Sequence, residues 1–409
     1  MRKKIVFIIL YIVLEIFLTG CCNARELEEL GISLLMSLDI ENDKVLLTGE
    51  VVDPSYTQSD GTSTEGSSVK YVQGTGNNIH EAFRDITLKF DRRLFISHNK
   101  VIIIGEELAK RGLVKHMDQL FRNNEQRETT YILIAKGTKG YEVMGINSGL
   151  EQIPANYISK LIENIEYNPK TRDVSMVEYL KTYYHKGHQP TVGVIEKKTK
   201  KEIDQTVEKA GAQSYELSVI GSAVFDKDVL VGYLNGNDTK SLNFIADNVK
   251  GGIITFPTPK PVIGVGMENE PIHKNLSSML IINNKTKNDI EIKDDNIVLK
   301  TKIKLRGAVG EVVGNIDISK EENLKELEKA CSKAAEEGIK SAVTKVQKEF
   351  GLDIFGFGLV FHRKYPEEWK NIKENWDEIF SKADFEIEVE TDIIRTGLIN
   401  TPIVKEKGK

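Results

Sequence analysis

The N-terminal part of the chain alternates between apolar runs and amphipathic segments. Lys44–Val52 (KVLLTGEVV) and Val69–Gly76 (VKYVQGTG) have the residue content of strands, and a polar stretch rich in glycine and serine separates them. The next segment places Ile79, Phe83, Ile86 and Phe90 at spacings of four, three and four, which predicts an amphipathic helix. We interpret this part as two strands followed by a helix.

Two further segments have continuous apolar cores instead of alternating ones. His98–Gly105 (HNKVIIIG) and Thr129–Gly137 (TTYILIAKG) are typical of strands that are buried on both faces. The amphipathic segment Glu106–Asn123 between them predicts a helix. The order helix, strand, helix, strand indicates a sheet that is covered by helices.

The middle of the chain begins with a charged segment. Residues 196–211 (EKKTKKEIDQTVEKAG) are nearly all polar, and their acidic members dilute the lysines, so we interpret them as an interdomain linker instead of a basic docking segment. Tyr215–Leu234 then predicts two strands around an Asp-Lys-Asp turn. The glycines of residues 249–266 predict short strands or bends.

The last third has the clearest periodicity. Asn296–Gly307 (NIVLKTKIKLRG) alternates apolar residues with lysines, which predicts a strand with one dry face. Apolar positions recur every three or four residues through 320–350, which predicts a long helix with Cys331 as a small buried residue. Pro366 suits the first turn of a second helix, with an apolar stripe made of Trp369, Ile372, Trp376, Ile379 and Phe380. Phe385–Ile394 predicts a closing strand.

These patterns predict an α+β fold in three regions. The expected parts are a signal peptide at 1–20, an N-terminal α+β domain at 21–195, a charged linker at 196–212, a middle domain at 213–285, a C-terminal α+β domain at 286–400 and a tail at 401–409.

The first residues have the pattern of a secretory signal. Arg2, Lys3 and Lys4 form a positive stretch before the apolar run Ile5–Leu18. A transmembrane helix is the alternative, but it would need about 20 apolar residues. This run is shorter and contains Glu15, which favours the signal peptide.

The residues after the apolar run match a lipid-attachment motif. Leu18, Thr19 and Gly20 precede Cys21 in the order of the bacterial lipobox, in which the cysteine thiol receives diacylglycerol and becomes the new N-terminus. Cys22 does not fit, because the residue three positions before it is Thr19. We predict lipidation at Cys21, with a covalent diacylglycerol and an N-acyl lipid. Each buried methylene of an acyl chain contributes about 0.8 kcal/mol, so two or three chains anchor a protein stably.

Composition excludes several classes of protein. The chain has 409 residues and a formal net charge of −5, with both signs interspersed, which argues against a nucleic-acid partner. Of its three cysteines, Cys21 and Cys22 are adjacent, so the chain has no disulfide framework.

No recognisable set of chemical residues stands out. The chain has no Gly-x-Ser-x-Gly elbow and no His-Glu-x-x-His motif. His185 and His188 lack a third metal ligand nearby, and Gly74–Gly76 lacks the third glycine of a phosphate loop. Gly264–Gly266 and Gly356–Gly358 are better explained as bends. We therefore predict no catalytic, metal-binding or cofactor-binding residues and no enzymatic activity.

Several segments together resemble those of one known protein family. The most specific is DIFGFG (Asp353–Gly358), followed by Pro366, Trp369 and Trp376 in the family's spacing. Other similar segments are Arg25–Ser33, Phe95–Leu113, Gly221–Leu234 and Ile303–Glu311. The family that these segments resemble is the Ger(x)C spore germination lipoproteins. The chain departs from the family just after the lipid cysteine, where Cys22 and Asn23 replace the frequent tryptophan and aspartate. The resemblance covers essentially the whole chain, and its shared positions are structural markers instead of catalytic residues.

The resemblance implies a place and a role. Members are the C subunits of nutrient germinant receptors, and they lie on the outer face of the spore inner membrane, where they work with integral membrane A- and B-type subunits. It also implies three α+β domains joined by short linkers. The expected function is a non-catalytic interaction subunit; the alternative is a lipid-anchored protein that itself captures the nutrient. A wall-modifying enzyme is disfavoured by the missing motifs.

Overall fold

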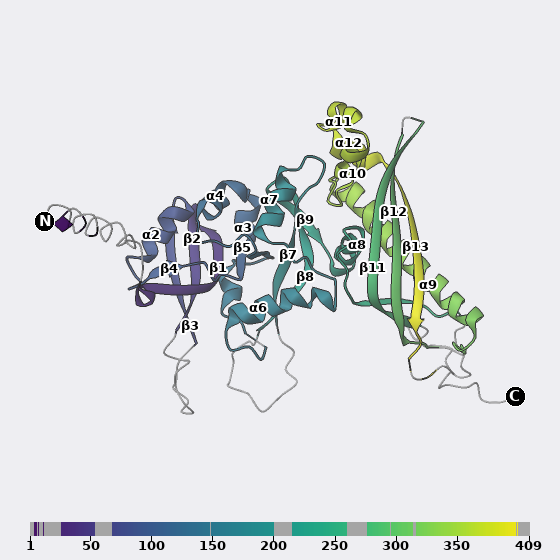
Figure 1. Ribbon diagram of the computed structural model, residues 1–409, viewed down its shortest axis with the longest axis horizontal. Helices are drawn as coiled ribbons and strands as arrows, with labels where there is room; N and C mark the ends of the chain where they lie inside the picture. The colour runs from purple at the N-terminus through teal and green to yellow at the C-terminus, as the bar shows by residue number, and fades with distance from the viewer. Residues whose placement is uncertain are drawn as a thin grey trace.

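A computed structural model describes most of the chain. The described residues are 26–53, 68–147, 149–199, 215–259, 276–294, 296–313 and 316–397, together with Lys4, Ile5, Phe7, Tyr11 and Ile399. The expected signal peptide is therefore almost wholly outside the described residues, and so are Cys21, Cys22 and Gly264–Gly266. Figure 1 shows the chain running from a nine-stranded sheet to a four-stranded sheet beside it.

The nine-stranded sheet has a parallel centre and antiparallel flanks. Its order is β3-β2-β1-β5-β6-β7-β8-β9, and β4 pairs with β1. The central strands β1, β5, β6 and β7 are parallel to one another, whereas the pairs β1–β2, β2–β3, β7–β8 and β8–β9 are antiparallel. The strands are β1 (Leu30–Glu41), β2 (Lys44–Val52), β3 (Val69–Gly76), β4 (Arg93–Phe95), β5 (Val101–Gly105), β6 (Tyr131–Ala135), β7 (Thr191–Thr199), β8 (Tyr215–Asp226) and β9 (Val229–Leu234).

Helices cover both faces of this sheet, which explains why β5 and β6 are apolar throughout. Ile102 and Ile104 pack into one core and Val101 and Ile103 into another, because successive strand residues point to opposite faces. The first core includes residues of α2 (Ile79–Ile86), α3 (Glu106–Lys110), α4 (Val114–Arg122) and α7 (Met176–Tyr184), and the second includes residues of α5 (Tyr141–Met144) and α6 (Pro154–Glu163). A 3-10 helix, η1 (Leu27–Glu29), precedes β1, and η3 (Asn164–Glu166) follows α6. The predicted strands here are confirmed.

The helix expected over Glu106–Asn123 is two helices instead of one. Gly112 has φ +97°, a left-handed conformation that ends α3 before α4 begins. The sequence pattern predicted the helical character of this segment, but it could not show this break.

The four-stranded sheet forms the C-terminal part. Its order is β10-β11-β12-β13, and β13 is parallel to β12 while the other pairs are antiparallel. The long helix α9 (Glu321–Glu349) and α8 (Gly236–Ile245) share one apolar core with the sheet. Figure 1 shows α9 running alongside the strands of this sheet, which are drawn in green to yellow. The strands are β10 (Ile253–Pro257), β11 (Leu276–Lys293), β12 (Asn296–Glu311) and β13 (Asp384–Arg395). The predictions of the long helix and of the strands around Asn296–Gly307 and Phe385–Ile394 are confirmed.

The second C-terminal helix is also divided. The predicted stripe from Trp369 to Phe380 is split between α11 (Pro366–Ile372) and α12 (Trp376–Lys382), and a further helix, α10 (Phe357–Lys364), precedes them. Trp369, Trp376 and Phe380 are nevertheless all buried in the common core, as their spacing indicated.

The sheets divide the chain differently from the expected domain boundaries. β7 continues to Thr199, so residues 196–199 of the expected linker are strand; residues 200–214 lie outside the described part. The expected middle domain, 213–285, has no sheet of its own among the described residues, because β8 and β9 extend the first sheet and β10 belongs to the second. The boundary at 285 falls inside β11. The α+β fold itself is confirmed.

Candidate functional site: the junction between the two sheets

The DIFGFG segment forms a buried turn between α9 and α10. Gly351 and Gly356 have φ +64° and +82°, conformations that favour glycine, and they allow the chain to reverse direction after α9. Asp353 is fully buried between them. This turn is the family-like segment that we had interpreted, at Gly356–Gly358, only as a bend.

The Asp353 carboxylate organises the turn. Its Oδ1 accepts hydrogen bonds from the backbone N–H groups of Phe355 (3.0 Å) and Gly356 (2.9 Å). Its Oδ2 accepts from the N–H of Gly358 (2.7 Å) and from Nε1 of Trp376 (2.9 Å). Burial raises the pKa of Asp353 to about 6, although the N–H donors act in the opposite direction. The carboxylate thus caps α10, which has no cap from its own N-cap residue.

The segment just before β7, a strand of the first sheet, contacts this turn. The backbone N–H of Gln189 donates to the Asp353 carbonyl (2.8 Å), and Gln189 Nε2 donates to Asp377 Oδ2 (2.9 Å). Nε2 of His188 lies 3.2 Å from the carbonyl oxygen of Ile354. Burial, reinforced by the charge of Arg172, lowers the pKa of His188 to about 4, so its ring is neutral at pH 7. The segment before β7 and the DIFGFG turn, which are more than 160 residues apart in sequence, are therefore joined by several polar contacts.

A second buried contact ties α8 to the loop between η3 and α7. Asn243 Nδ2 donates to the carbonyl oxygens of Pro169 (2.9 Å) and Thr171 (2.7 Å), and its Oδ1 accepts from Arg172 Nη1 (2.7 Å). Asn243 is fully buried, and burial lowers the pKa of Arg172. Together the two contacts fix how the two sheets are placed relative to each other.

The histidines, glycines and cysteine that we weighed as metal-binding, phosphate-binding or reactive residues take part in packing and hydrogen bonding in the structure. No group of three or more His, Cys, Asp or Glu side chains suited to a metal ion occurs in the described ranges. His188 is used in the junction, and the backbone N–H of His185 bonds to Thr182 at the end of α7. Gly74 and Gly76 lie against α2, where an added Cβ would be within 2.6 Å of Ala82 backbone atoms, so close packing explains them. Cys331 is buried, as predicted, and burial raises the pKa of its thiol to about 12.

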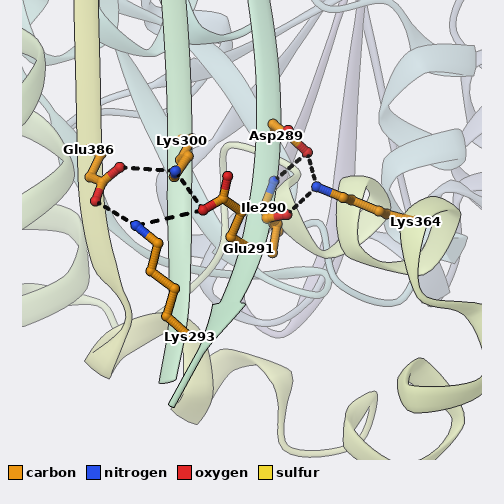
Figure 2. Close-up of polar contacts among 7 residues, drawn as sticks. All are labelled: Asp289, Ile290, Glu291, Lys293, Lys300, Lys364 and Glu386. Carbon is orange, nitrogen blue, oxygen red and sulfur yellow. Dashed lines mark hydrogen bonds and ion pairs between the residues drawn. The ribbon is translucent and has the colours of Figure 1, made fainter. Parts of the chain in front are cut away.

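A network of exposed charges links the strands of the second sheet (Figure 2). Lys300 on β12 pairs with Glu291 on β11 (2.6 Å) and with Glu386 on β13 (3.3 Å), and Lys293 pairs with the same two glutamates. Lys364 on α10 donates to Asp289 Oδ1 (2.7 Å) and to the Ile290 carbonyl (2.6 Å). Exposed ion pairs contribute at most about 1 kcal/mol each. The network links the strands in their register and attaches α10 to β11.

Two more buried carboxylates, which the sequence pattern did not indicate, cap α5 and α6, the helices on one face of the first sheet. Glu50 on β2 accepts from the backbone N–H of Ala155 at the start of α6 (3.1 Å) and from the Tyr71 hydroxyl (3.2 Å). Asp39 on β1 accepts from the N–H of Gly140 (2.6 Å) at the start of α5. Neither helix has a side-chain cap of its own. An acidic residue inside an otherwise apolar strand was the available signal, because such a charge needs buried donors.

The Glu50 carboxylate makes stability depend on pH. Burial raises the pKa of Glu50 from 4.5 to about 7, so the folded chain binds this proton more tightly than the unfolded chain does. The stability contributed by the protonated form is complete below about pH 4.5 and is lost as pH rises toward about 7. His188, whose pKa is lowered, acts in the opposite direction below its ordinary value, so Glu50 must be isolated by comparison with a variant.

We therefore expect the Glu50→Gln variant to lose more stability, relative to wild type, at pH 5 than at pH 8. The difference between the two pH values should be about 2 to 3 kcal/mol, since one pKa unit corresponds to about 1.4 kcal/mol. Urea unfolding of both proteins at the two pH values measures it. Equal losses at pH 5 and pH 8 would show that Glu50 does not titrate in this range.

No helix in the described part of the chain is long and apolar enough to span a membrane.

Comparisons with known proteins cover almost the whole chain. Residues 23–197 match the family model described as the spore germination protein N-terminal domain, and residues 220–397 match the model described as spore germination B3/GerAC like, C-terminal. Spore germination protein KC of Bacillus subtilis (strain 168) is 27% identical over 413 residues, which is 98% of this chain and 98% of that protein. Spore germination protein B3 of the same organism is 25% identical over 93% of this chain and 95% of that protein.

A solved structure supports the same assignment at the level of fold. The crystal structure of the GerBC protein aligns with a TM-score of 0.53 and 20% identity, covering 88% of this chain and 96% of that chain. The two family models divide this chain between residues 197 and 220, next to the undescribed segment 200–214. By its matches along both halves, the chain belongs to the GerAC-like family of spore germination proteins, the family that its DIFGFG segment and tryptophan spacing resemble.

Proposed function

We propose that this protein is the lipid-anchored C subunit of a spore nutrient germinant receptor and acts by contacts with the integral membrane A- and B-type subunits. In this proposal the lipid on Cys21 holds the protein on the outer face of the spore inner membrane. The two sheets then form one body of fixed shape that the membrane subunits bind. The protein itself performs no chemical step.

The junction is the observation that carries a scaffold role. The most specific family residues form hydrogen bonds with one another inside the buried turn, because Gly358 and Trp376 both donate to Asp353. A catalytic carboxylate needs access to a substrate, and Asp353 is 0% exposed. These residues therefore favour a function in which the relative placement of the two sheets matters.

The Cys21→Ala variant tests the anchor and the role together. We expect wild-type protein from spore membranes to start at a lipidated Cys21, whereas the variant should keep residues 1–20 and carry no lipid. Mass spectrometry of the N-terminal peptide measures both. In spores that have only this nutrient receptor, we also expect the variant to slow nutrient-triggered germination, followed as loss of absorbance.

Cys22→Ala is the matched control, because it removes the neighbouring thiol and leaves the lipobox intact. It should keep the lipid and the wild-type response. A lipid on Cys22, or a wild-type protein that retains residues 1–20, would contradict the anchor. An unchanged nutrient response after deletion of the whole gene, in those same spores, would contradict the receptor role.

A further inference from the structure

Strand β3 is one of the two edge strands of the nine-stranded sheet, the other being β9, and part of the outer side of β3 is unpaired among the described residues. The backbone N–H of Thr75 donates to the Asp85 carboxylate (2.9 Å) and so points away from β2. Because donors alternate along a strand, the N–H groups of Tyr71 and Gln73 point the same way. Asp85 closes the end of this edge and leaves the stretch around Tyr71–Gln73 open.

A groove runs along this open stretch. It has a volume of about 570 Å³, and three consecutive residues, Tyr71 to Gln73, line it. Consecutive strand residues point to opposite faces, so a groove that touches all three passes the backbone edge itself. Ile86 and Phe90 line it on one side of the sheet, and Tyr141 and Gly145 line it on the other.

One edge strand of the second sheet, β13, differs from β3 because its outward N–H groups are paired. On β13, the N–H of Val389 donates to Glu336 and the N–H of Ile393 donates to Glu328, both at 2.9 Å. These glutamates recur on one face of α9, with Ser332 between them bonded to Thr391. Unpaired edges invite pairing with other chains, and proteins commonly block them. The same molecule blocks β13 along much of its length but blocks β3 only at its end.

We propose that the β3 edge binds an extended segment of a partner protein, which pairs with Tyr71–Gln73 as an added strand. The proposal rests on the proposed function, in which the partners are the receptor's membrane subunits. The segment has alternating residues: apolar ones against the half-buried Val72 and Phe90, and hydrogen-bonding ones against Tyr71 and Tyr141. Main-chain bonds supply the affinity and the two walls supply the specificity.

The walls also decide between a single segment and a second copy of this chain. A second copy would bring its own β3 flanked by its own α2 and α5, and these would meet the same elements of the first copy. A single extended chain carries no such covering helices and fits between the walls. The occupant is therefore a lone strand.

The test uses a photo-crosslinking amino acid in the full-length protein, in intact spore membranes. Position Lys89 lines the groove, and its neighbour Leu88, which is 82% exposed, does not, so Leu88 is the matched control position. We expect a crosslink from position 89, and not from 88, to one segment of a membrane subunit with alternating apolar and polar residues. Peptide mass spectrometry identifies the segment.

Two substitutions at Gln73 separate main-chain pairing from side-chain contact. Gln73→Pro removes the outward N–H, which an edge strand tolerates, whereas Gln73→Ala keeps it; both lose the bond to Thr48. We expect Gln73→Pro to lower the crosslink yield about tenfold, the effect of one hydrogen bond, and Gln73→Ala to leave it near wild type. Gly145→Trp fills the groove, and an added Cβ there meets nothing within 4 Å, so this variant decides the matter if Gln73→Pro does not fold.

Several results would overturn the proposal. A crosslink from position 89 to residues 54–67 would show that this chain fills its own groove. Equal yields from positions 88 and 89, or an unchanged yield in both Gln73→Pro and Gly145→Trp, would exclude strand addition. If membrane subunits co-purify with the protein but no groove crosslink forms, only this proposal fails; if none co-purifies, the proposed function fails first.

Discussion

Replacing Asp353 with alanine is expected to lower the free energy of unfolding by about 3 to 5 kcal/mol, the cost of leaving buried polar partners unpaired. The substitution removes the acceptor for three backbone N–H groups and for Nε1 of Trp376. Bulk water does not reach these donors in the folded chain, because Asp353 is fully buried. Urea unfolding followed by tryptophan fluorescence measures the loss, since both tryptophans lie in the same core.

Two comparisons make this result specific. Asp353→Asn keeps the size but turns an NH₂ group toward N–H donors, so it should also destabilise by more than about 1 kcal/mol. Asp392→Ala removes a carboxylate that is 60% exposed and paired with Arg306, so it should cost less than about 1 kcal/mol. If Asp353→Asn were as stable as wild type, the carboxylate would not be the organising acceptor.

Gly358→Ala is expected to disturb the junction by steric overlap. An added Cβ would lie 2.5 Å from both the Cα and the carbonyl oxygen of Gly187, and 2.7 Å from Nε1 of Trp376. In a helix, alanine is more favourable than glycine by about 1 kcal/mol. Overpacking, however, typically costs about 1 to 3 kcal/mol, and here the added Cβ would meet backbone atoms, which cannot move aside easily. We expect a net destabilisation in urea, together with faster proteolysis near Gly187.

Gly338→Ala is the matched control, because Gly338 lies inside α9 and an added Cβ meets nothing within 4 Å. It should stabilise the protein by up to about 1 kcal/mol. Stabilisation by both alanine substitutions would contradict the close approach of Gly358 to Gly187. Destabilisation by both would point to α9 and α10 being sensitive in general.

Local periodicity predicted those elements whose burial is set by their own residues. The apolar runs at β5 and β6 predicted strands buried on both faces, and the apolar spacing through 320–350 predicted α9 within one residue at each end. Periodicity failed where a single backbone angle decides, as at Gly112 between α3 and α4. It also gave no indication that β8 would pair with β7 and join the first sheet, because this pairing forms across a long connection in the chain.

The sequence indicated some residues of the candidate site but not the contacts between them. The DIFGFG segment and the tryptophans stood out as family markers, but nothing local indicated that Asp353 accepts a bond from Trp376 or that Gln189 docks there. Asp39 and Glu50 were overlooked because a charge in an apolar strand is read as an exposed position unless its donors are known. Those donors come from helices about 100 residues further along the chain.

The sequence by itself determined the family, the α+β class, the long helix and the buried strands, and it supplies the prediction of a lipid on Cys21. These features follow from residue identity and short-range spacing, which the printed chain contains in full. Only the tertiary structure decided which strands share a sheet, how the buried carboxylates cap distant helices, and that β13 is blocked while β3 is left partly open. Hydrogen bonds and steric contacts of this kind depend on distances between segments far apart in the chain, and periodicity carries no information about such distances.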